Sequence, residues 1–227
     1  MLFRSALKAF ARSTYKGICV IDFSRNDFLY VSDSMVSIFG EDKDKILEYG
    51  CDIYSMKLPT EELKTFLEIN TNGFKFLNNI PTNEITEYTI SYDIHIIKGG
   101  KKQLFHHCLT PMLLTEDGKT WLALCTFSPS AGKKIGHVRV QKSGDSLFYE
   151  YDLLKHRWEE KITTQITDKE REILLLSMQG YTMNEISTRL CKSIDTIKLY
   201  KRMLFTKLDV KNITEAISHA LNYRLFY

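Results

Sequence analysis

Residues 167–208 read TDKEREILLLSMQGYTMNEISTRLCKSIDTIKLYKRMLFTKL, and this stretch decides the architecture of the last third of the chain. Thr167 is followed three positions later by Glu170, and Thr182 is followed in the same way by Glu185. Each pair matches a capping box, in which the hydroxyl and the carboxylate bond backbone N–H groups that a helix start leaves unpaired. The two boxes therefore predict helices that begin after Thr167 and Thr182.

Two more helices follow from similar signals. Ser193 can cap a third helix, and Asn212 with Glu215 resembles the capping box closely enough to predict a fourth. Gly180 is expected to end the first helix, because glycine readily adopts the left-handed conformation found after helix ends. The segment from residue 166 to 227 is therefore predicted to form four short helices.

The spacing of apolar residues on the third helix predicts which side faces inward. Residues three, four or seven apart share one side of a helix. That rule gives an inward stripe with partners on the second helix: Ile186, Leu190, Ile197, Leu204 and Leu208. It leaves Lys198, Leu199 and Arg202 on the opposite, exposed face. A short helix, a tight turn and a longer basic helix are typical of a helix-turn-helix.

The net positive charge of the chain is concentrated in this last segment. Residues 162–227 hold ten Lys and Arg against seven Asp and Glu, whereas the remaining 161 residues hold twenty-one of each. A basic helix attracts phosphate, which favours a nucleic-acid partner. Charge alone would equally fit a solvated surface helix, so the DNA interpretation depends on the helix-turn-helix pattern.

The stretch ITDKEREILLLSMQGYTMNEISTRLCKSIDTIKLYKRMLFTKLDVKNITEA, residues 166–216, resembles the LuxR-type DNA-binding domain of bacterial transcription regulators. The resemblance implies a four-helix bundle whose third helix enters the major groove of double-stranded DNA. It implies base contacts from Lys198, Leu199 and Arg202, with Arg202 on a guanine. It also implies phosphate contacts from Thr182, Ser193, Thr196, Lys201 and Lys207.

The first two thirds of the chain alternate between strand and helix signals. Apolar runs at 17–22 and 28–32 precede a short helix, capped by Ser34 and stopped by Gly40, and a second helix from Thr60. Three strands are expected at 88–97, 103–114 and 120–127, joined by the turn sequences KGGK at 98–101 and EDGK at 116–119. Two strands, helices and three antiparallel strands resemble the order of a PAS domain.

These signals together predict an α+β chain with four parts. Residues 1–15 are expected to form an amphipathic helix, 16–130 a PAS-like sensor or dimerisation domain, 131–163 a short β-rich connector, and 164–227 the LuxR-type domain. The stretch 129–136, rich in small and basic residues, is the expected boundary before the connector.

No cofactor is predicted for the PAS-like part. A flavin photosensor of this class would need an Asn-Cys-Arg-like stretch, which Cys51 in Gly-Cys-Asp does not supply, and a haem ligand from the helices is missing because no His precedes His95. An apolar pocket for a small metabolite stays open, although core packing is the expected role of the same side chains. The candidate wall residues are Phe39, Tyr54, Phe66, Phe74, Phe76, Phe105 and Trp121.

Metal binding and disulfides are not expected either. His106 and Cys108 point to one side of a strand and His107 to the other, so we expect strand histidines at a surface or an interface rather than a metal site. The five cysteines form no CxxC pair, and their odd number argues against a disulfide framework. A reducing cytoplasm is the expected location, and no apolar run is long enough to span a membrane.

The function expected from the sequence is that of a bacterial transcription regulator that is not an enzyme. A phosphorylated receiver domain is excluded, because Asp22 is the only residue of its acidic site that is present. An enzyme is not expected, because no nucleophile and base are predicted to lie together in a pocket. A homodimer on a palindromic operator is expected, since one recognition helix reads only a few base pairs. The alternative is a protein-interaction or dimerisation module whose helix-turn-helix docks on the transcription machinery, RNA polymerase or another regulator, without ligand sensing.

Overall fold

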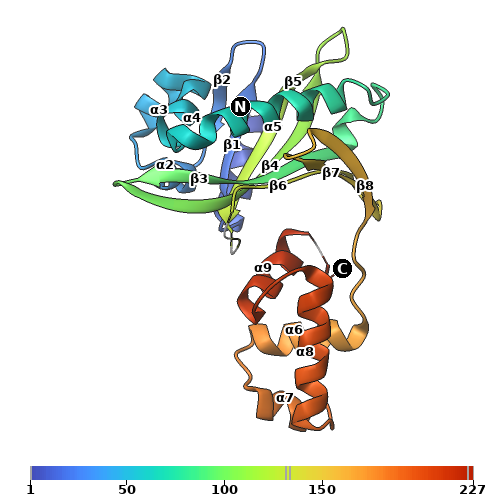
Figure 1. Ribbon diagram of the computed structural model, residues 1–227. Coiled ribbons are helices and arrows are strands. Elements are labelled where there is room, and N and C mark those ends of the chain that lie inside the picture. The colour runs from blue at the N-terminus through green and yellow to red at the C-terminus, as the bar shows by residue number, and fades with distance from the viewer. Residues whose placement is uncertain (1, 131, 133, 224, 227) are drawn as a thin grey trace. The chain divides into compact units, whose positions relative to one another are not determined.

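The computed structural model describes residues 2–130, 132, 134–223, 225 and 226, and the chain forms two compact units (Figure 1). The first unit covers residues 1–162 and combines a sheet with helices, while the second covers residues 163–227 and is helical in its described part. The predicted α+β class is confirmed.

An antiparallel sheet of eight strands forms the framework of the first unit, in the order β2-β1-β5-β4-β3-β6-β7-β8. The strands are β1 (Gly17–Asp22), β2 (Asp27–Val31), β3 (Tyr88–Lys98), β4 (Lys101–Leu114), β5 (Thr120–Pro129), β6 (Gly136–Lys142), β7 (Leu147–Asp152) and β8 (Arg157–Ile162). The chain order of two strands, helices and three strands that the PAS resemblance implied is present in β1 to β5.

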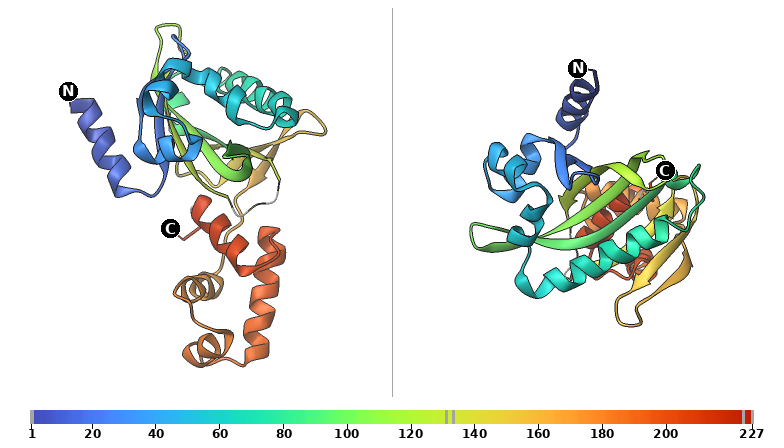
Figure 2. Two further views of the ribbon diagram at one scale, coloured as in Figure 1. Left: turned by 90° about the vertical axis from the view of Figure 1, so that its left-hand side faces the viewer. Right: turned by 90° about the horizontal axis from the view of Figure 1, so that it is seen from above.

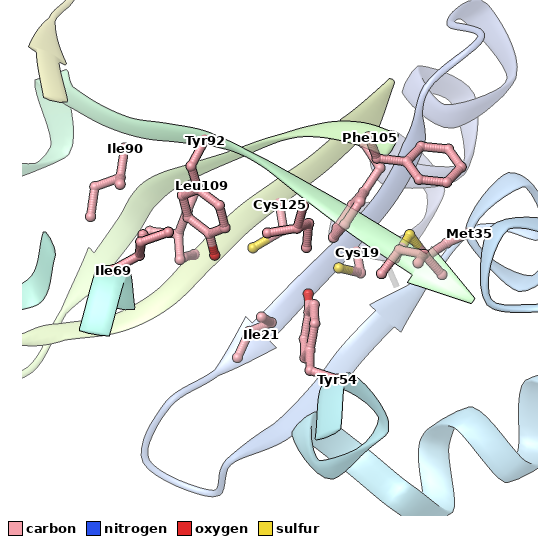
Figure 3. Close-up of a cluster of buried hydrophobic side chains, with 14 of the residues drawn as sticks. Cys19, Ile21, Met35, Tyr54, Ile69, Ile90, Tyr92, Phe105, Leu109 and Cys125 are labelled. Carbon is pink, nitrogen blue, oxygen red and sulfur yellow. The ribbon is translucent and has the colours of Figure 1, made fainter. Parts of the chain in front are cut away.

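Helices between β2 and β3 cover one face of this sheet (Figure 1). They are α2 (Asp33–Phe39), α3 (Lys43–Tyr49), η1 (Gly50–Asp52), α4 (Ile53–Lys57), α5 (Thr60–Leu77) and η2 (Ile85–Glu87). Their apolar side chains, such as Met35, Tyr54 and Ile69, pack on sheet residues that include Cys19 and Cys125 (Figure 3). Burial of this apolar surface is the main stabilisation of the unit.

A smaller cluster lies on the opposite face of β1. Ile18 and Val20 alternate with the core residues Cys19 and Ile21, so their side chains point to the other side of the sheet. Leu7 of α1 (Leu2–Ser13) packs against them. Figure 2 shows α1 as the helix at the N-terminus. The helix buries Leu7 and exposes its basic residues Arg4 and Lys8, as an amphipathic helix does.

Most turn signals are confirmed, whereas the predicted cap of α2 is wrong. Gly99 and Gly100 adopt positive φ between β3 and β4, as the KGGK turn required. Ser32, not Ser34, caps α2, because its hydroxyl accepts from the Met35 N–H at 3.2 Å and from the Ile18 N–H at 2.9 Å. Ser32 therefore ties the helix start to β1 as well.

Residues 136–162, expected within a connector, extend the same sheet. The register of β6 on β3 pairs Ile90 with Val140, and Val140 is buried in the main core. Phe76 of α5 also packs against Tyr149 and Trp158 of β7 and β8. The expected boundary at 129–136 includes residues 131 and 133, which lie outside the described residues.

The second unit consists of α6 (Asp168–Met178), α7 (Met183–Arg189), α8 (Ile194–Leu208) and α9 (Ile213–Asn222). Both predicted capping boxes are present, with Thr167 and Glu170 opening α6 and Thr182 and Glu185 opening α7. Two small clusters, one around Leu204 and one around Ile197, form the core of this bundle. The four predicted helices are confirmed.

Across the described ranges, none of the helices combines the length and the apolar character needed to cross a bilayer.

Candidate nucleic-acid interface

The start of α8 is fixed by the cap predicted from the sequence. The Ser193 hydroxyl oxygen accepts from the Thr196 N–H at 3.2 Å, and the hydroxyls of the two residues lie 2.8 Å apart. This bond satisfies one of the N–H groups that the first helical turn leaves unpaired. It also places both hydroxyls at the positive end of the helix dipole.

The rotation of α8 agrees with the predicted stripe. Ile197, Leu204 and Leu208 are buried inside the bundle. Leu199, on the other side, is 43% exposed, and Lys198 and Arg202 are exposed beside it. An exposed leucine between two cations can meet both the apolar and the charged parts of a DNA groove. We name Lys198, Leu199 and Arg202 the α8 face.

One ion pair lies next to the α8 face. Lys198 Nζ is 3.2 Å from Asp195 Oδ1, and both side chains are largely exposed. Exposed pairs one helical turn apart contribute little free energy, so a phosphate or a base can displace the carboxylate at small cost.

Lys207 has a more buried partner. Its Nζ donates to Glu170 Oε2 at 2.9 Å, and Glu170 is only 5% exposed. Burial acts to raise the pKa of Glu170, but bonds from the Thr167 backbone and side chain and from Lys207 outweigh it, so the pKa is lowered. Lys207 therefore joins α8 to the capping box of α6 in this structure.

The remaining predicted phosphate contacts differ in exposure. Thr182 is exposed and its hydroxyl is bonded within the α7 capping box. Lys201 lies half-buried, on the side of α8 near the stripe, and burial lowers its pKa. Lys201 is thus not part of the α8 face.

A hollow beside the α8 face was missed by the sequence reasoning. It is lined by Thr167, Glu170, Arg202, Met203, Thr206 and Lys207. The spacing in the sequence could have indicated this hollow. Arg202 and Thr206 are one turn apart on α8, and so are Met203 and Lys207, so all four lie along one side of the helix. Arg202 therefore borders both the α8 face and this hollow.

In the first unit, most candidate pocket residues lie in the core, and one does not. Phe39, Tyr54 and Phe105 are buried, and Phe66 stacks on Tyr54 with ring centroids 5.3 Å apart. Phe74 and Phe76 pack against the edge of the same cluster. Trp121 is 39% exposed and its Nε1 donates to Asp22, so its prediction as a pocket wall is wrong.

The strand histidines are not at a surface, contrary to expectation. His107 is 2% exposed and lies among Tyr54, Tyr92 and Phe127. His106 is equally buried on the other face of β4, where its Nδ1 lies 2.9 Å from Asp93 Oδ1. Among the residues that the structure describes, no group of three His, Cys, Asp or Glu side chains could hold a metal ion.

Comparison with known families identifies the second unit. Residues 164–220 match the family described as bacterial regulatory proteins, luxR family. The C-terminal unit is therefore a LuxR-type helix-turn-helix domain, and the resemblance seen in its capping boxes and stripe is confirmed.

Curated relatives match over a limited part of the chain. The response regulator protein VraR of Staphylococcus aureus is 33% identical over 92 residues, which is 39% of this chain and 44% of that protein. VraR of Staphylococcus epidermidis is 33% identical over 100 residues, or 42% of this chain and 48% of that protein. The chain thus matches about half the length of these relatives.

Two solved structures resemble this chain at low sequence identity. The phage VqmA–DPO complex is 14% identical, with a TM-score of 0.38 over 99% of this chain and 89% of that chain. A PAS domain from Colwellia psychrerythraea is 14% identical, with a TM-score of 0.42 over 57% of this chain and 97% of that one.

Proposed function

We propose that this chain is a sequence-specific transcription regulator that binds double-stranded DNA through the α8 face. The observation that carries the proposal is the orientation of α8 within a LuxR-type domain. Its apolar stripe is buried, and Lys198, Leu199 and Arg202 are exposed together on the other side. A helix presented in this way fits the width of the major groove.

The base contacts are assigned to Lys198, Leu199 and Arg202. The guanidinium of Arg202 has paired donors in a fixed plane that match O6 and N7 of a guanine. Phosphate contacts are assigned to Thr182 at the start of α7 and to four residues at the start of α8 or within it: Ser193, Thr196, Lys201 and Lys207. Lys207 must exchange Glu170 for a phosphate, and half-buried Lys201 must extend its side chain to reach one.

Binding as a homodimer to a palindromic operator is part of the proposal. One recognition helix contacts few base pairs, so two half-sites about one helical turn apart are needed for useful specificity. The described part of α9 offers a partly exposed apolar surface for such pairing, with Leu221 at 52% exposure.

The first unit is proposed to supply sensing or dimerisation, and no catalytic role is assigned to it. Its aromatic core around Tyr54 and Phe66 would hold a small apolar molecule if the core opens to admit one. We propose that the regulator acts in the cytoplasm and that residues 1–15, 16–130, 131–163 and 164–227 have separate functional roles, although β6 to β8 belong structurally to the sheet of the first unit.

Selection of DNA from a random pool by the full chain tests the proposal. Enrichment of an inverted repeat, bound by two chains, is the expected result. The rival function is docking on RNA polymerase through the same domain. It is favoured if no sequence is enriched while purified polymerase retains the chain, and if replacing Lys198 and Arg202 with Ala leaves that retention unchanged.

A further inference from the structure

The exposed side of α8 extends beyond the three residues of the α8 face. Met203 follows Leu199 by four residues, so both side chains project from the same side of the helix. Met203 is 53% exposed, against 43% for Leu199. Among the large apolar side chains that the structure describes in the second unit, none is more exposed than Met203. Two apolar side chains therefore follow one another along the exposed side of a basic helix.

The groups around Met203 indicate which kind of partner it meets. Arg202 and Lys207 border the same hollow as Met203, and both are exposed. The carboxylate in this hollow, Glu170, is already paired with Lys207 at 2.9 Å. An apolar protein surface placed here would cover Arg202 without supplying an opposite charge, which costs free energy. A partner that carries anionic groups beside small apolar groups fits better, and double-stranded DNA is such a partner.

The hollow leaves room for a partner group beside Met203. Thr206 lines it together with Met203 on α8, and Thr167 and Glu170 line it from α6. The Met203 side chain therefore has open space next to it instead of packed neighbours. Methionine is unbranched, flexible and polarizable, so its side chain adapts to the position of a small apolar group.

The chemistry of the major groove leaves one such group for Met203 to contact. The base edges in this groove present hydrogen-bond donors, hydrogen-bond acceptors and the C5-methyl group of thymine. A thioether has no donor and is a weak acceptor, so it gains little from the polar groups. Burial of a thymine methyl against Met203 removes apolar surface of both groups from water.

We propose that Met203 contacts the C5-methyl group of a thymine and so adds a base pair to those read by the α8 face. This inference rests on the proposed function, which places α8 in the major groove. Four residues of an α-helix span about 6 Å, and successive bases along a DNA strand are about 3.4 Å apart. The thymine is therefore expected about two base pairs from the base pair that Leu199 meets.

Replacement of thymine by uracil tests the proposal, because uracil lacks the methyl group and keeps the same hydrogen-bonding groups. The full chain is titrated by fluorescence anisotropy against the selected operator, with each thymine replaced in turn by deoxyuridine. At one thymine of each half-site, the parent should lose about fourfold in affinity for one buried methyl. Met203→Ala should bind the thymine and uracil forms of that position alike, while its sensitivity at other thymines stays as in the parent.

Two further variants serve as controls. Met203→Leu keeps an apolar side chain and should retain the sensitivity to uracil. Met178→Ala removes another exposed methionine of the same unit, 44% exposed at the end of α6, and should leave every uracil effect as in the parent. Because Met203 is exposed, Met203→Ala should unfold at the temperature of the parent, which thermal unfolding measures.

The outcomes separate this proposal from the proposed function. An operator whose half-sites hold no thymine, a parent that binds the uracil forms as tightly as the operator, or a Met203→Ala variant that responds to uracil as the parent does would overturn the role of Met203. In each of these cases the chain still binds a specific DNA sequence. If no sequence is selected and bound at all, both the role of Met203 and the proposed function are overturned.

Discussion

At the scale of single residues, the surroundings of His107 keep its imidazole ring neutral. The His107 ring lies 4.8 Å from the Tyr92 ring and 4.4 Å from the Phe127 ring, measured between centroids. Its two nitrogens have no hydrogen-bond partner within the described part of the chain. Burial, helped by the charge of His106, lowers the pKa of His107 to about 3. The native state therefore holds this ring neutral at physiological pH.

His107 should make the first unit sensitive to acid. The unfolded chain binds a proton at the ordinary pKa of 6.5, but the folded chain does not bind it until about pH 3. The free energy of unfolding should therefore fall as the pH drops below 6.5, by about 2 kcal/mol at pH 5. Urea unfolding followed by tryptophan fluorescence reports this unit, because Trp121 and Trp158 both belong to it.

In the His107→Phe variant, the free energy of unfolding should fall by about 2 kcal/mol less than in the parent when the pH drops to 5. A phenyl ring fills the same space but does not bind a proton. The exposed His137 provides a matched control, and His137→Asn should leave the pH dependence as in the parent. If the parent and His107→Phe lose equal stability between pH 7 and pH 5, His107 is not buried as a neutral ring.

The ion pair between Glu170 and Lys207 gives a second prediction at the scale of single residues. Glu170→Gln keeps a side chain able to complete a capping box and removes the charge that attracts the lysine. If Lys207 binds phosphate, the variant should bind all DNA sequences more tightly, with a salt slope steeper by about 1 for each released lysine. Fluorescence anisotropy at several salt concentrations measures this slope.

Glu172→Gln removes the same charge from an exposed position of the same helix and serves as the control. Equal slopes for Glu170→Gln and Glu172→Gln would mean that Lys207 has only a structural role.

At the scale of single elements, local chemistry predicted the helices well. The caps at Thr167, Thr182 and Ser193 are formed by bonds between residues three positions apart, so they depend on little else in the fold. The cap of α2 was misplaced for a different reason. Ser32 caps it because the same hydroxyl also binds β1, which is fourteen residues away in sequence. Local patterns carry no information about such a partner.

Ser193 allows the two roles assigned to the start of α8 to be separated. Ser193→Ala should cost about 1 kcal/mol of stability, whereas Ser193→Asp should retain it, because a carboxylate also caps a helix. The same Asp would repel a phosphate, so DNA affinity should fall by about tenfold.

Thr214→Asp adds an equal charge at the exposed first turn of α9 and should leave DNA affinity near that of the parent. Thermal unfolding and anisotropy together measure both effects. Unchanged DNA binding by Ser193→Asp would remove Ser193 from the phosphate contacts.

At the scale of the whole molecule, the sequence predicted the order of elements but not all of their pairings. The KGGK turn pairs Lys98 with Lys101, and counting back along the hairpin places Asp93 opposite His106. That pair could have been found from the turn. The pairing of β6 with β3 could not, because it joins strands about fifty residues apart with no tight turn between them.

The orientation of α8 is the central claim, and the binding of Arg202→Ala to the selected operator tests it most directly. Anisotropy is measured for parent and variant on the operator and on each single base-pair substitution of it. The account predicts that Arg202→Ala costs about 1 to 3 kcal/mol and loses discrimination at one guanine of each half-site, while preferences elsewhere persist. A variant that binds the operator and discriminates at every position as the parent does would contradict the account.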